Sequence, residues 1–327
     1  MHSDRKSVTV TTNYLHPGGP VERLLEEAGF DVRFSSEVLR RRTGQAVFEH
    51  VAQTDALILG TEPLTASDMA AIGGLEIVAR TGTGYDNVDL AAADERGIAV
   101  CNTPGANRQS VVELAIGLLL NLARDLPANM NATARAEWPQ KSGAELSGAL
   151  LGILGMGAIG RSVAQSARAL GMSVIGHDPW VSAEAMATEG VEAVTFDELL
   201  RRSDYISLHI ALTDETHNLI DLSVFRRMKN SAFLVNTSRG GIINEQDLIL
   251  ALEQGEISGA ALDVIEHEPI SPADPLLGAP NLLLTAHIAG ATEQARQRSA
   301  ESAVQQIIDF FAGRTPAHQV NLSKLSE

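Results

Sequence analysis

Two series of alternating strand-like and helix-like segments constrain the fold of this chain more than any other feature. From residue 7 to about residue 102, amphipathic runs such as VERLLEEAG alternate with β-rich runs, which are SVTVTT, DVRFSS, DALILG, LEIVART and GIAVCN. Strands that alternate with helices form a mostly parallel sheet covered by helices on both faces. The first series therefore predicts an α/β domain.

A second series of the same kind fills the later half of the chain. Its β-rich runs are ALLGILG, MSVIGHD, DYISLHI, SAFLVNTS, SGAALDV and NLLLTA. Long helices are predicted over about 110–126 and 293–312, one before and one after this series. A chain of 327 residues exceeds the size at which one core keeps growing. We expect two Rossmann-like or flavodoxin-like domains, with residues 103–292 inserted into a discontinuous domain of residues 1–102 plus 293–327.

A glycine motif follows the first strand of the second series. Gly155, Gly157 and Gly160 form GxGxxG between an apolar strand and a helical pattern. Such glycines allow a tight turn and close approach of a pyrophosphate to the free N–H groups of a helix N-terminus. The structural alternative is a plain turn between a strand and a helix. The context predicts a dinucleotide site.

An acidic residue stands where a dinucleotide site needs one. Asp178 ends the second strand of this series, about 20 residues beyond the glycines. Its carboxylate can accept hydrogen bonds from both ribose hydroxyls and would repel a 2′-phosphate, which favours NAD over NADP. Alternatively, Asp178 only caps a turn before Pro179.

Three charged residues lie just beyond strand ends in the second series. Arg239 follows LVNTS, Glu268 follows ALDVIEH and His287 follows LLLTA. The carboxyl ends of parallel strands meet at one edge, where ligands bind. Taken singly, each residue has an ordinary structural alternative as a solvated turn arginine, a loop-start glutamate or a histidine at the rim of a sheet.

Together these three side chains match the needs of 2-keto acid reduction. Arg239 would bind the carboxylate and polarise the keto oxygen through its planar fork of donors. His287 would exchange the proton, because histidine titrates near neutral pH. Glu268 would orient His287 and favour its charged form. The three residues, in this order along the chain, predict hydride transfer between a nicotinamide and a small 2-hydroxy acid.

Motifs along most of the chain resemble those of one enzyme family. They are ARTGTGYDNVD (79–89), CNTPGAN (101–107), GILGMGAIGR (152–161), VNTSRGGIINEQDL (235–248), ALDVIEHEP (261–269) and TAHIAGAT (285–292). From about residue 75 to 295 the chain resembles the D-isomer-specific 2-hydroxyacid dehydrogenases, most closely the D-3-phosphoglycerate dehydrogenase branch.

The resemblance implies roles for further residues. It makes residues 103–292 the NAD domain and the two chain ends the catalytic, substrate-side domain. It implies that Arg239, Glu268 and His287 are catalytic, and that Asp263 reaches the nicotinamide carboxamide; a strand-end cap is the alternative for Asp263. Further expected NAD contacts are Thr83, Ala158, Ile159, Thr237, Ser238 and Gly290. The expected substrate contacts are Arg80, Thr81, Gly82 and Arg239, with backbone donors around Thr81 to Gly84 receiving the carboxylate in a cleft between the domains.

The sequence departs from the phosphoglycerate dehydrogenase pattern in one loop. Those enzymes usually present an arginine after the third N-terminal strand, whereas LGTEPLT (59–65) has Gly60 and Glu62 there. Arg80, Arg108, Arg124 or Arg135 could supply the charge, the last two from a partner subunit. A glyoxylate or hydroxypyruvate reductase, or a sulfolactate dehydrogenase, would fit the same catalytic residues. The chain ends soon after its last long helix, so we expect no regulatory domain.

Charge and composition narrow the partners. A net charge of −16 and a pI of about 5.0 argue against nucleic acid and anionic membranes. The single Cys101 cannot form an internal disulfide, no metal-ligand spacing is present and the first residues show no secretion signal, so we expect a cytoplasmic protein without a metal.

A polar stretch near residues 127–147 bears on assembly and on a rival function. Together with the family resemblance it favours a homodimer, in which the stretch reaches a second subunit; a surface excursion of the same chain is the alternative. The family also includes NAD-responsive corepressors, which are binding proteins. The absence of a long basic or disordered extension disfavours that function.

Overall fold

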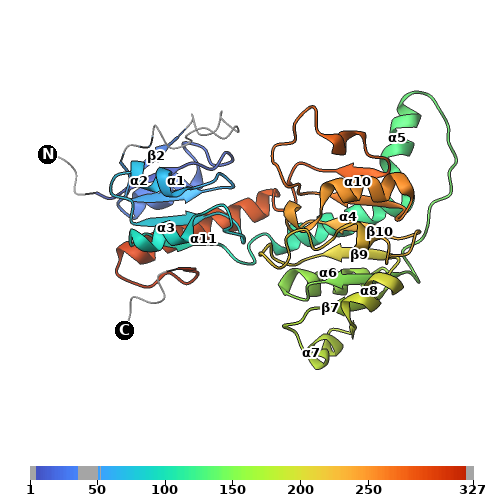
Figure 1. Ribbon diagram of the computed structural model, residues 1–327. Coiled ribbons are helices and arrows are strands. Elements are labelled where there is room, and N and C mark those ends of the chain that lie inside the picture. The colour runs from blue at the N-terminus through green and yellow to red at the C-terminus, as the bar shows by residue number, and fades with distance from the viewer. Residues whose placement is uncertain (1–4, 36–50, 52, 322–327) are drawn as a thin grey trace. The chain divides into compact units, whose positions relative to one another are not determined.

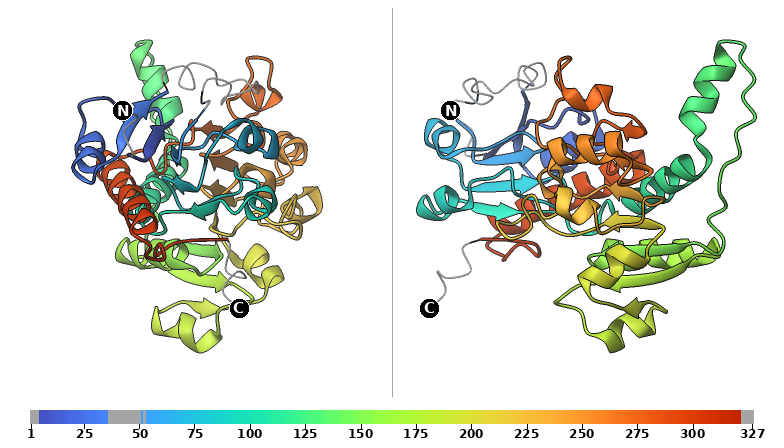
Figure 2. Two further views of the ribbon diagram at one scale, coloured as in Figure 1. Left: turned by 90° about the vertical axis from the view of Figure 1, so that its left-hand side faces the viewer. Right: turned by 45° about the vertical axis from the view of Figure 1, so that its right-hand side comes forward.

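The chain forms two compact α/β units, which are drawn in Figures 1 and 2. This computed structural model describes residues 5–35, 51 and 53–321. Residues 1–4, which belong to the N-terminal stretch where the sequence predicts no secretion signal, lie outside the described residues. Unit 1 comprises Met1–Asn107 and Thr292–Glu327, and unit 2 comprises Arg108–Ala291. The boundaries predicted from the sequence are 102/103 and 292/293.

Unit 1 is built on a five-stranded parallel sheet with the order β2-β1-β3-β4-β5, which is the flavodoxin-like order. The strands are β1 (Ser7–Val10), β2 (Asp31–Phe34), β3 (Ala56–Leu59), β4 (Ile77–Arg80) and β5 (Ala99–Cys101). Every residue of β1, β3, β4 and β5 is buried, as expected for strands covered on both faces. The expected strands of the first series are confirmed.

Helices cover both faces of the unit 1 sheet. On one face, Val21 and Leu25 of α1 (Pro20–Glu27) pack with Ala303 and Ile307 of α11 (Glu293–Phe311). On the other face lie α2 (Ala66–Ala71) and α3 (Leu90–Glu95). The two ends of the chain therefore share one hydrophobic core.

Unit 2 contains a seven-stranded parallel sheet with the order β12-β11-β10-β9-β6-β7-β8. Its strands are β6 (Leu150–Leu154), β7 (Ser173–His177), β8 (Glu192–Ala193), β9 (Tyr205–Leu208), β10 (Phe233–Asn236), β11 (Gly259–Leu262) and β12 (Leu282–Leu284). The strand order reverses between β6 and β9, which is the topological switch point of a doubly wound sheet. The two Rossmann-like folds predicted from the sequence are thus confirmed.

The unit 2 sheet is also covered on both faces. One core contains side chains of α4 (Arg108–Arg124), α6 (Ala158–Ala169) and α7 (Ala183–Thr188). The other contains side chains of α8 (Phe196–Arg202), α9 (Leu222–Phe225) and α10 (Glu245–Gln254). Two short 3-10 helices, η1 (Gly240–Ile242) and η2 (Pro275–Gly278), follow β10 and precede β12.

The polar stretch after α4 contains a helix that the sequence pattern did not predict. Asp125 adopts a left-handed conformation with φ of 47°, which ends α4 before the predicted residue 126. Pro127 then lies in the first turn of α5 (Leu126–Ala134), where its fixed φ and missing N–H are tolerated. In Figure 2, α5 and the strand-free segment after it stand away from the sheet of unit 2. This projecting segment, residues 126–148, is called the arm below.

The three motif glycines have three different steric environments. Gly155 has φ of 96°, and a Cβ there would lie 2.5 Å from the carbonyl oxygen of His209. A Cβ at Gly160 would lie 2.0 Å from the carbonyl oxygen of Gly155, so α6 packs directly on the turn. A Cβ at Gly157, by contrast, would meet no atom within 4 Å. Only the first and third glycines are required by the fold itself.

We therefore predict that one added methyl group lowers the stability at Gly160 and leaves it almost unchanged at Gly157. Gly160→Ala should destabilise the protein by about 1–3 kcal/mol, because the backbone of the turn must move to admit the Cβ. Gly157→Ala should change the free energy of unfolding by less than about 0.5 kcal/mol. Urea unfolding of both variants measures the difference. Equal stability of the two would contradict the assigned packing role of Gly160.

Candidate active site

A histidine and a glutamate meet at the carboxyl edge of the unit 2 sheet. His287 follows β12 and Glu268 follows β11, and these strands are neighbours. His287 Nδ1 lies 2.7 Å from Glu268 Oε2, and Glu268 Oε1 also accepts the Ile265 N–H at 3.3 Å. Both side chains are about one-third exposed, at 34% and 36%. The carboxylate therefore orients the imidazole, while solvent can still reach the pair.

The turn that carries His287 is held by a buried carboxylate. Asp263 is 1% exposed, and it accepts hydrogen bonds from the Thr285 hydroxyl at 2.6 Å and from the Ile288 and Ala289 N–H groups at 2.9 and 2.8 Å. Its carbonyl oxygen accepts the His287 N–H at 2.8 Å. His287 has φ of 51°, an uncommon conformation for a residue with a side chain. Asp263 thus fixes the backbone on which His287 is mounted.

These hydrogen bonds limit how Asp263 could reach a nicotinamide. Three of the hydrogen bonds that its carboxylate can accept are made within the turn, two at Oδ1 and one at Oδ2. The strand-end cap that the sequence offers as an alternative is therefore present. The carboxamide contact stays a prediction, and only Oδ2 has room for it. Gly290 follows the same turn.

Arg239 lies at the same edge, in the turn after β10. Asn236 organises this turn, because its side chain accepts from the N–H and hydroxyl of Ser238 at 2.9 and 2.7 Å and donates to the Arg239 carbonyl at 2.8 Å. Arg239 Nη1 donates to the Ser238 carbonyl at 2.8 Å. The strand order thus brings the three predicted catalytic residues onto neighbouring strand ends, with a direct contact between Glu268 and His287.

Asp178 is hydrogen-bonded to the glycine turn at the switch point of the sheet. Asp178 Oδ2 accepts the Met156 N–H of the turn at 2.8 Å, and Oδ1 accepts the Trp180 N–H at 2.9 Å. Asp178 therefore also makes the turn-capping contact that the sequence offers as an alternative. Gly157 caps α6 without any side-chain hydrogen bond. The first-turn N–H groups, at Ala158, Ile159 and Gly160, have no acceptor within the helix.

One orphaned hydroxyl lies near this edge. Thr237 follows β10 and is 8% exposed, and its Oγ1 has no hydrogen-bond partner within the described part of the chain. A buried polar atom of this kind usually has a partner. A bound polar group is thus expected beside Thr237. Its predicted place among the cofactor contacts stays a prediction.

Two of the four backbone donors of residues 81–84, in the loop after β4 of unit 1, are open. The Thr81 N–H donates to the Leu59 carbonyl at 2.8 Å, and the Gly82 N–H donates to the Arg80 carbonyl at 3.0 Å. Thr83 is held through its side chain, which bonds Asn107 Oδ1 at 3.1 Å. Among the residues that the structure describes, the N–H groups of Thr83 and Gly84 have no acceptor. These two, rather than Thr81 and Gly82, are available to bind a carboxylate.

Four arginines are expected as substitutes for the cation that the loop 59–65 lacks, and their surroundings differ. Arg80 is 8% exposed, and its guanidinium covers Gly82, where a Cβ would lie 1.3 Å from Nη1. Arg108 is the first residue of α4, and Arg124 is the last. Arg135 pairs with Glu137 at 3.0 Å on the arm. Of these four, only Arg80 adjoins the loop after β4, because it is the last residue of that strand.

A buried polar pair beside the glycine turn escaped prediction from the sequence. The sequence pattern places His209 inside a strand, but it lies one residue beyond β9. Its Nε2 lies 2.9 Å from the Ser207 hydroxyl. Burial lowers the pKa of His209 to about 4, so this histidine is neutral at physiological pH. Polar residues within the apolar run YISLHI were the available signal.

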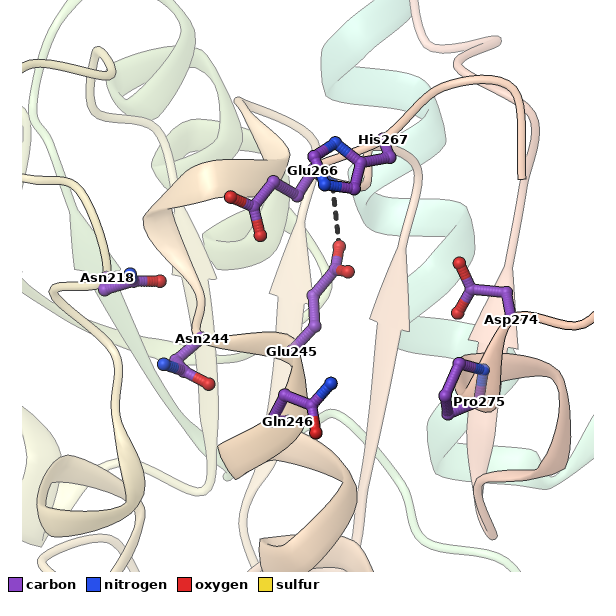
Figure 3. Close-up of a pocket in the computed structure, with 8 residues that line it drawn as sticks. All are labelled: Asn218, Asn244, Glu245, Gln246, Glu266, His267, Asp274 and Pro275. Carbon is purple, nitrogen blue, oxygen red and sulfur yellow. Dashed lines mark hydrogen bonds between the residues drawn. The ribbon is translucent and has the colours of Figure 1, made fainter. Parts of the chain in front are cut away.

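A cavity of about 300 Å³ is lined in part by Glu266 and His267, the two residues before Glu268 (Figure 3). Its lining includes Glu245, Glu266 and Asp274, and Glu245 accepts the Glu266 N–H at 2.7 Å. Burial raises the pKa of Glu245, and the nearby carboxylates add to that shift. The carboxylates make this cavity unsuitable for an anionic acid. It is therefore not a candidate site for a 2-hydroxy or 2-keto acid.

Neither a metal centre nor a membrane-spanning helix is found in the described chain. Within residues 5–35, 51 and 53–321, no cluster of at least three His, Cys, Asp or Glu side chains is arranged to hold a metal ion. In the same residues, no helix combines the length and the apolar character needed to cross a bilayer.

Known proteins share both the sequence and the fold. Residues 116–289 match the D-isomer specific 2-hydroxyacid dehydrogenase, NAD binding domain. The chain is 38% identical to the D-3-phosphoglycerate dehydrogenase of Methanocaldococcus jannaschii over 311 residues, which cover 93% of this chain and 58% of that relative. It is 39% identical to the glyoxylate reductase of Korarchaeum cryptofilum over 284 residues, which cover 85% and 86%.

A solved structure extends the likeness to both units. The TT0316 protein from Thermus thermophilus superposes with a TM-score of 0.85 and 33% identity, covering 96% of this chain and 99% of that one. These matches confirm the resemblance drawn from the motifs. With an NAD-binding domain over residues 116–289 and relatives that share both units, the chain belongs to the D-isomer specific 2-hydroxyacid dehydrogenase family.

Proposed function

We propose that this protein is an NAD-dependent oxidoreductase that interconverts a small D-2-hydroxy acid and its 2-keto acid. The observation that carries the proposal is the 2.7 Å contact between His287 and Glu268 in the sheet that also holds the glycine turn. A histidine oriented by a carboxylate is suited to exchanging a proton with an alcohol or keto oxygen. The family membership supports the same reaction class.

The residues of unit 2 fit an NAD molecule. The open space at Gly157 admits a pyrophosphate against the backbone, and the first-turn N–H groups of α6 can donate to it. Asp178 would accept the adenosine ribose hydroxyls, and Thr237 has a free hydroxyl for a further polar contact. When bound, the nicotinamide supplies or accepts the hydride. The remaining proposed NAD contacts are Ala158, Ile159, Ser238, Asp263 and Gly290 of unit 2 and Thr83 of unit 1.

Each catalytic side chain then has one task. Arg239 would bind the carboxylate and polarise the keto oxygen by donating hydrogen bonds. In the reductive direction, protonated His287 would donate its Nε2 proton to that oxygen, while Glu268 holds Nδ1. Thr83 and Gly84 would donate their open N–H groups to the substrate carboxylate. Asp263 holds the turn and does not itself move a proton.

The substrate class is also a proposal. The chain spans 58% of the length of the M. jannaschii phosphoglycerate dehydrogenase and 86% of the glyoxylate reductase. We infer that it acts as a D-3-phosphoglycerate dehydrogenase, with glyoxylate, hydroxypyruvate or sulfolactate chemistry as the alternative. A corepressor-like binding role is disfavoured by the intact His287–Glu268 pair, which a cofactor switch does not need.

Assembly and location complete the proposal. The arm exposes Met130 and Trp138 at 68% and 78%, and a groove of about 260 Å³ lies at its foot between α4 and Leu170. Large apolar side chains on a projecting segment suit an interface with a second copy. We therefore infer a homodimer. A cytoplasmic location accords with the single cysteine, Cys101, which is buried.

Removing the catalytic imidazole should stop turnover and leave the cofactor bound. For His287→Ala we expect a fall in kcat of about 10²–10⁴-fold, because proton transfer loses its donor. Arg239→Ala should behave alike. The dissociation constant for NADH, measured by fluorescence, should change by less than about threefold in both. His267→Ala, which removes a histidine of the neighbouring cavity, is the control, and an equal loss there would contradict the assignment.

Neutralising Asp178 should change cofactor choice. In Asp178→Asn the oxygen can still accept the Met156 N–H, but the charge that repels a 2′-phosphate is gone. We expect the preference for NADH over NADPH in kcat/KM to fall by about tenfold or more, equivalent to about 1.4 kcal/mol. Unaltered preference would show that Asp178 only caps its turn. Thermal unfolding of the variant checks that the turn is retained.

Charge on the arm should dissociate the dimer. Met130→Asp and Trp138→Asp place a carboxylate in the proposed interface, where its desolvation is costly. Light scattering after gel filtration should give about half the wild-type mass. Trp180→Asp is the control, because Trp180 is 92% exposed but lies outside the arm. A wild-type protein that is already monomeric would overturn the proposed assembly.

A further inference from the structure

An arginine outside the sequence motifs lies at the carboxyl edge of the unit 1 sheet. Arg296 is exposed in the first turns of α11, and its guanidinium carbon lies 5.0 Å from the centre of the Tyr14 ring. Its guanidinium makes no hydrogen bond or ion pair with any other residue that the structure describes. A cation–π contact orients the side chain and leaves its five N–H donors open.

Helix stability does not explain this arginine. The N-terminal end of a helix carries partial positive charge, so acidic side chains stabilise it and cations do not. Glu293 and the Thr292 cap, which accepts the Ala295 N–H at 3.1 Å, fit that rule. Arg296 runs against it. An anionic group bound near the edge would compensate the unfavourable position.

Tyr14 connects Arg296 to the loop that offers open donors. The Thr81 side chain lies beside the Tyr14 hydroxyl. Thr81 Oγ1 itself donates to the Leu59 carbonyl at 3.1 Å. Thr81 is two residues before Thr83. One tyrosine ring therefore separates the guanidinium from the loop that would bind the substrate carboxylate.

Charged groups of both signs lie around Tyr14. They include Arg80, Arg296 and Glu62, and the Glu62 carboxylate accepts the Gly60 N–H at 2.8 Å. Burial raises the pKa of Tyr14, so the phenol itself stays neutral. Two buried hydroxyls at the same edge, of Thr12 and Thr103, have no partner within the described residues. Hydroxyls without partners and an exposed guanidinium at one edge are both suited to binding an oxyanion.

Resting on the proposed function, we propose that Arg296, oriented by Tyr14, binds the phosphate ester at the far end of the substrate. It would replace the cation that the loop 59–65 lacks. Arg80 cannot take this role alone, because its guanidinium is buried over Gly82. The protein would thus select 2-keto acids that carry a second oxyanion.

The test compares three 2-keto acids that differ only beyond the keto carbon. Glyoxylate, hydroxypyruvate and 3-phosphohydroxypyruvate are reduced with NADH by the full chain and by Arg296→Met. We expect the ratio of kcat/KM for the phosphorylated acid to that for hydroxypyruvate to fall about tenfold in the variant. The loss should lie mainly in KM, because the contact is made before and during hydride transfer. Arg296→Lys should recover part of it.

The control removes the same charge from the opposite edge of the sheet. Arg96 follows α3, which runs against the strands, so it lies at the amino edge. Arg96→Met should keep the wild-type ratio. An equal loss with all three acids in Arg296→Met, or no loss at all, would overturn the assignment while the proposed function stands. If the wild-type protein reduced none of the three acids, the proposed function and this assignment would both fail.

Discussion

The parallel direction of every strand pair in both sheets is the constraint on which the site depends. Ten pairings, six in unit 2 and four in unit 1, run the same way. A parallel sheet sends all its chain exits to one edge, and its buried strands leave that edge as the place where polar side chains can gather. Arg239, Glu268 and His287 come from three consecutive strand exits for this reason.

At that edge a buried carboxylate supports the turn that presents a partly exposed histidine. Asp263 accepts three hydrogen bonds from the turn that contains His287, and hydrogen bonds to a charged acceptor are stronger than neutral ones. These bonds offset the cost of the left-handed conformation at His287, which is of order 1–3 kcal/mol. Glu268 then needs only to orient the ring. Backbone and side chain are thus fixed by different residues.

At the proposed cofactor site, too, different residues have different tasks. Gly155 and Gly160 are required by close contacts inside the protein, whereas Gly157 faces open space. Asp178 has two tasks in this arrangement, because the carboxylate that holds the glycine turn is also the one proposed to accept the ribose hydroxyls. Cofactor preference and local stability are therefore coupled at this residue. A substitution of Asp178 therefore changes both the cofactor preference and the stability of the turn.

The sequence by itself determined the two α/β units, the glycine turn and the three catalytic candidates, because these depend on hydrophobic period and on residues next to strand ends. Such patterns are local, and parallel topology converts them directly into positions. Only the tertiary structure decided that Asp263 supports the His287 turn, that Thr83 and Gly84 keep open donors, and that Arg296 meets Tyr14. These contacts join residues distant in the chain, and no local pattern records which strand exits become neighbours. The helix α5 escaped prediction because a polar, projecting segment has no buried face to impose a period.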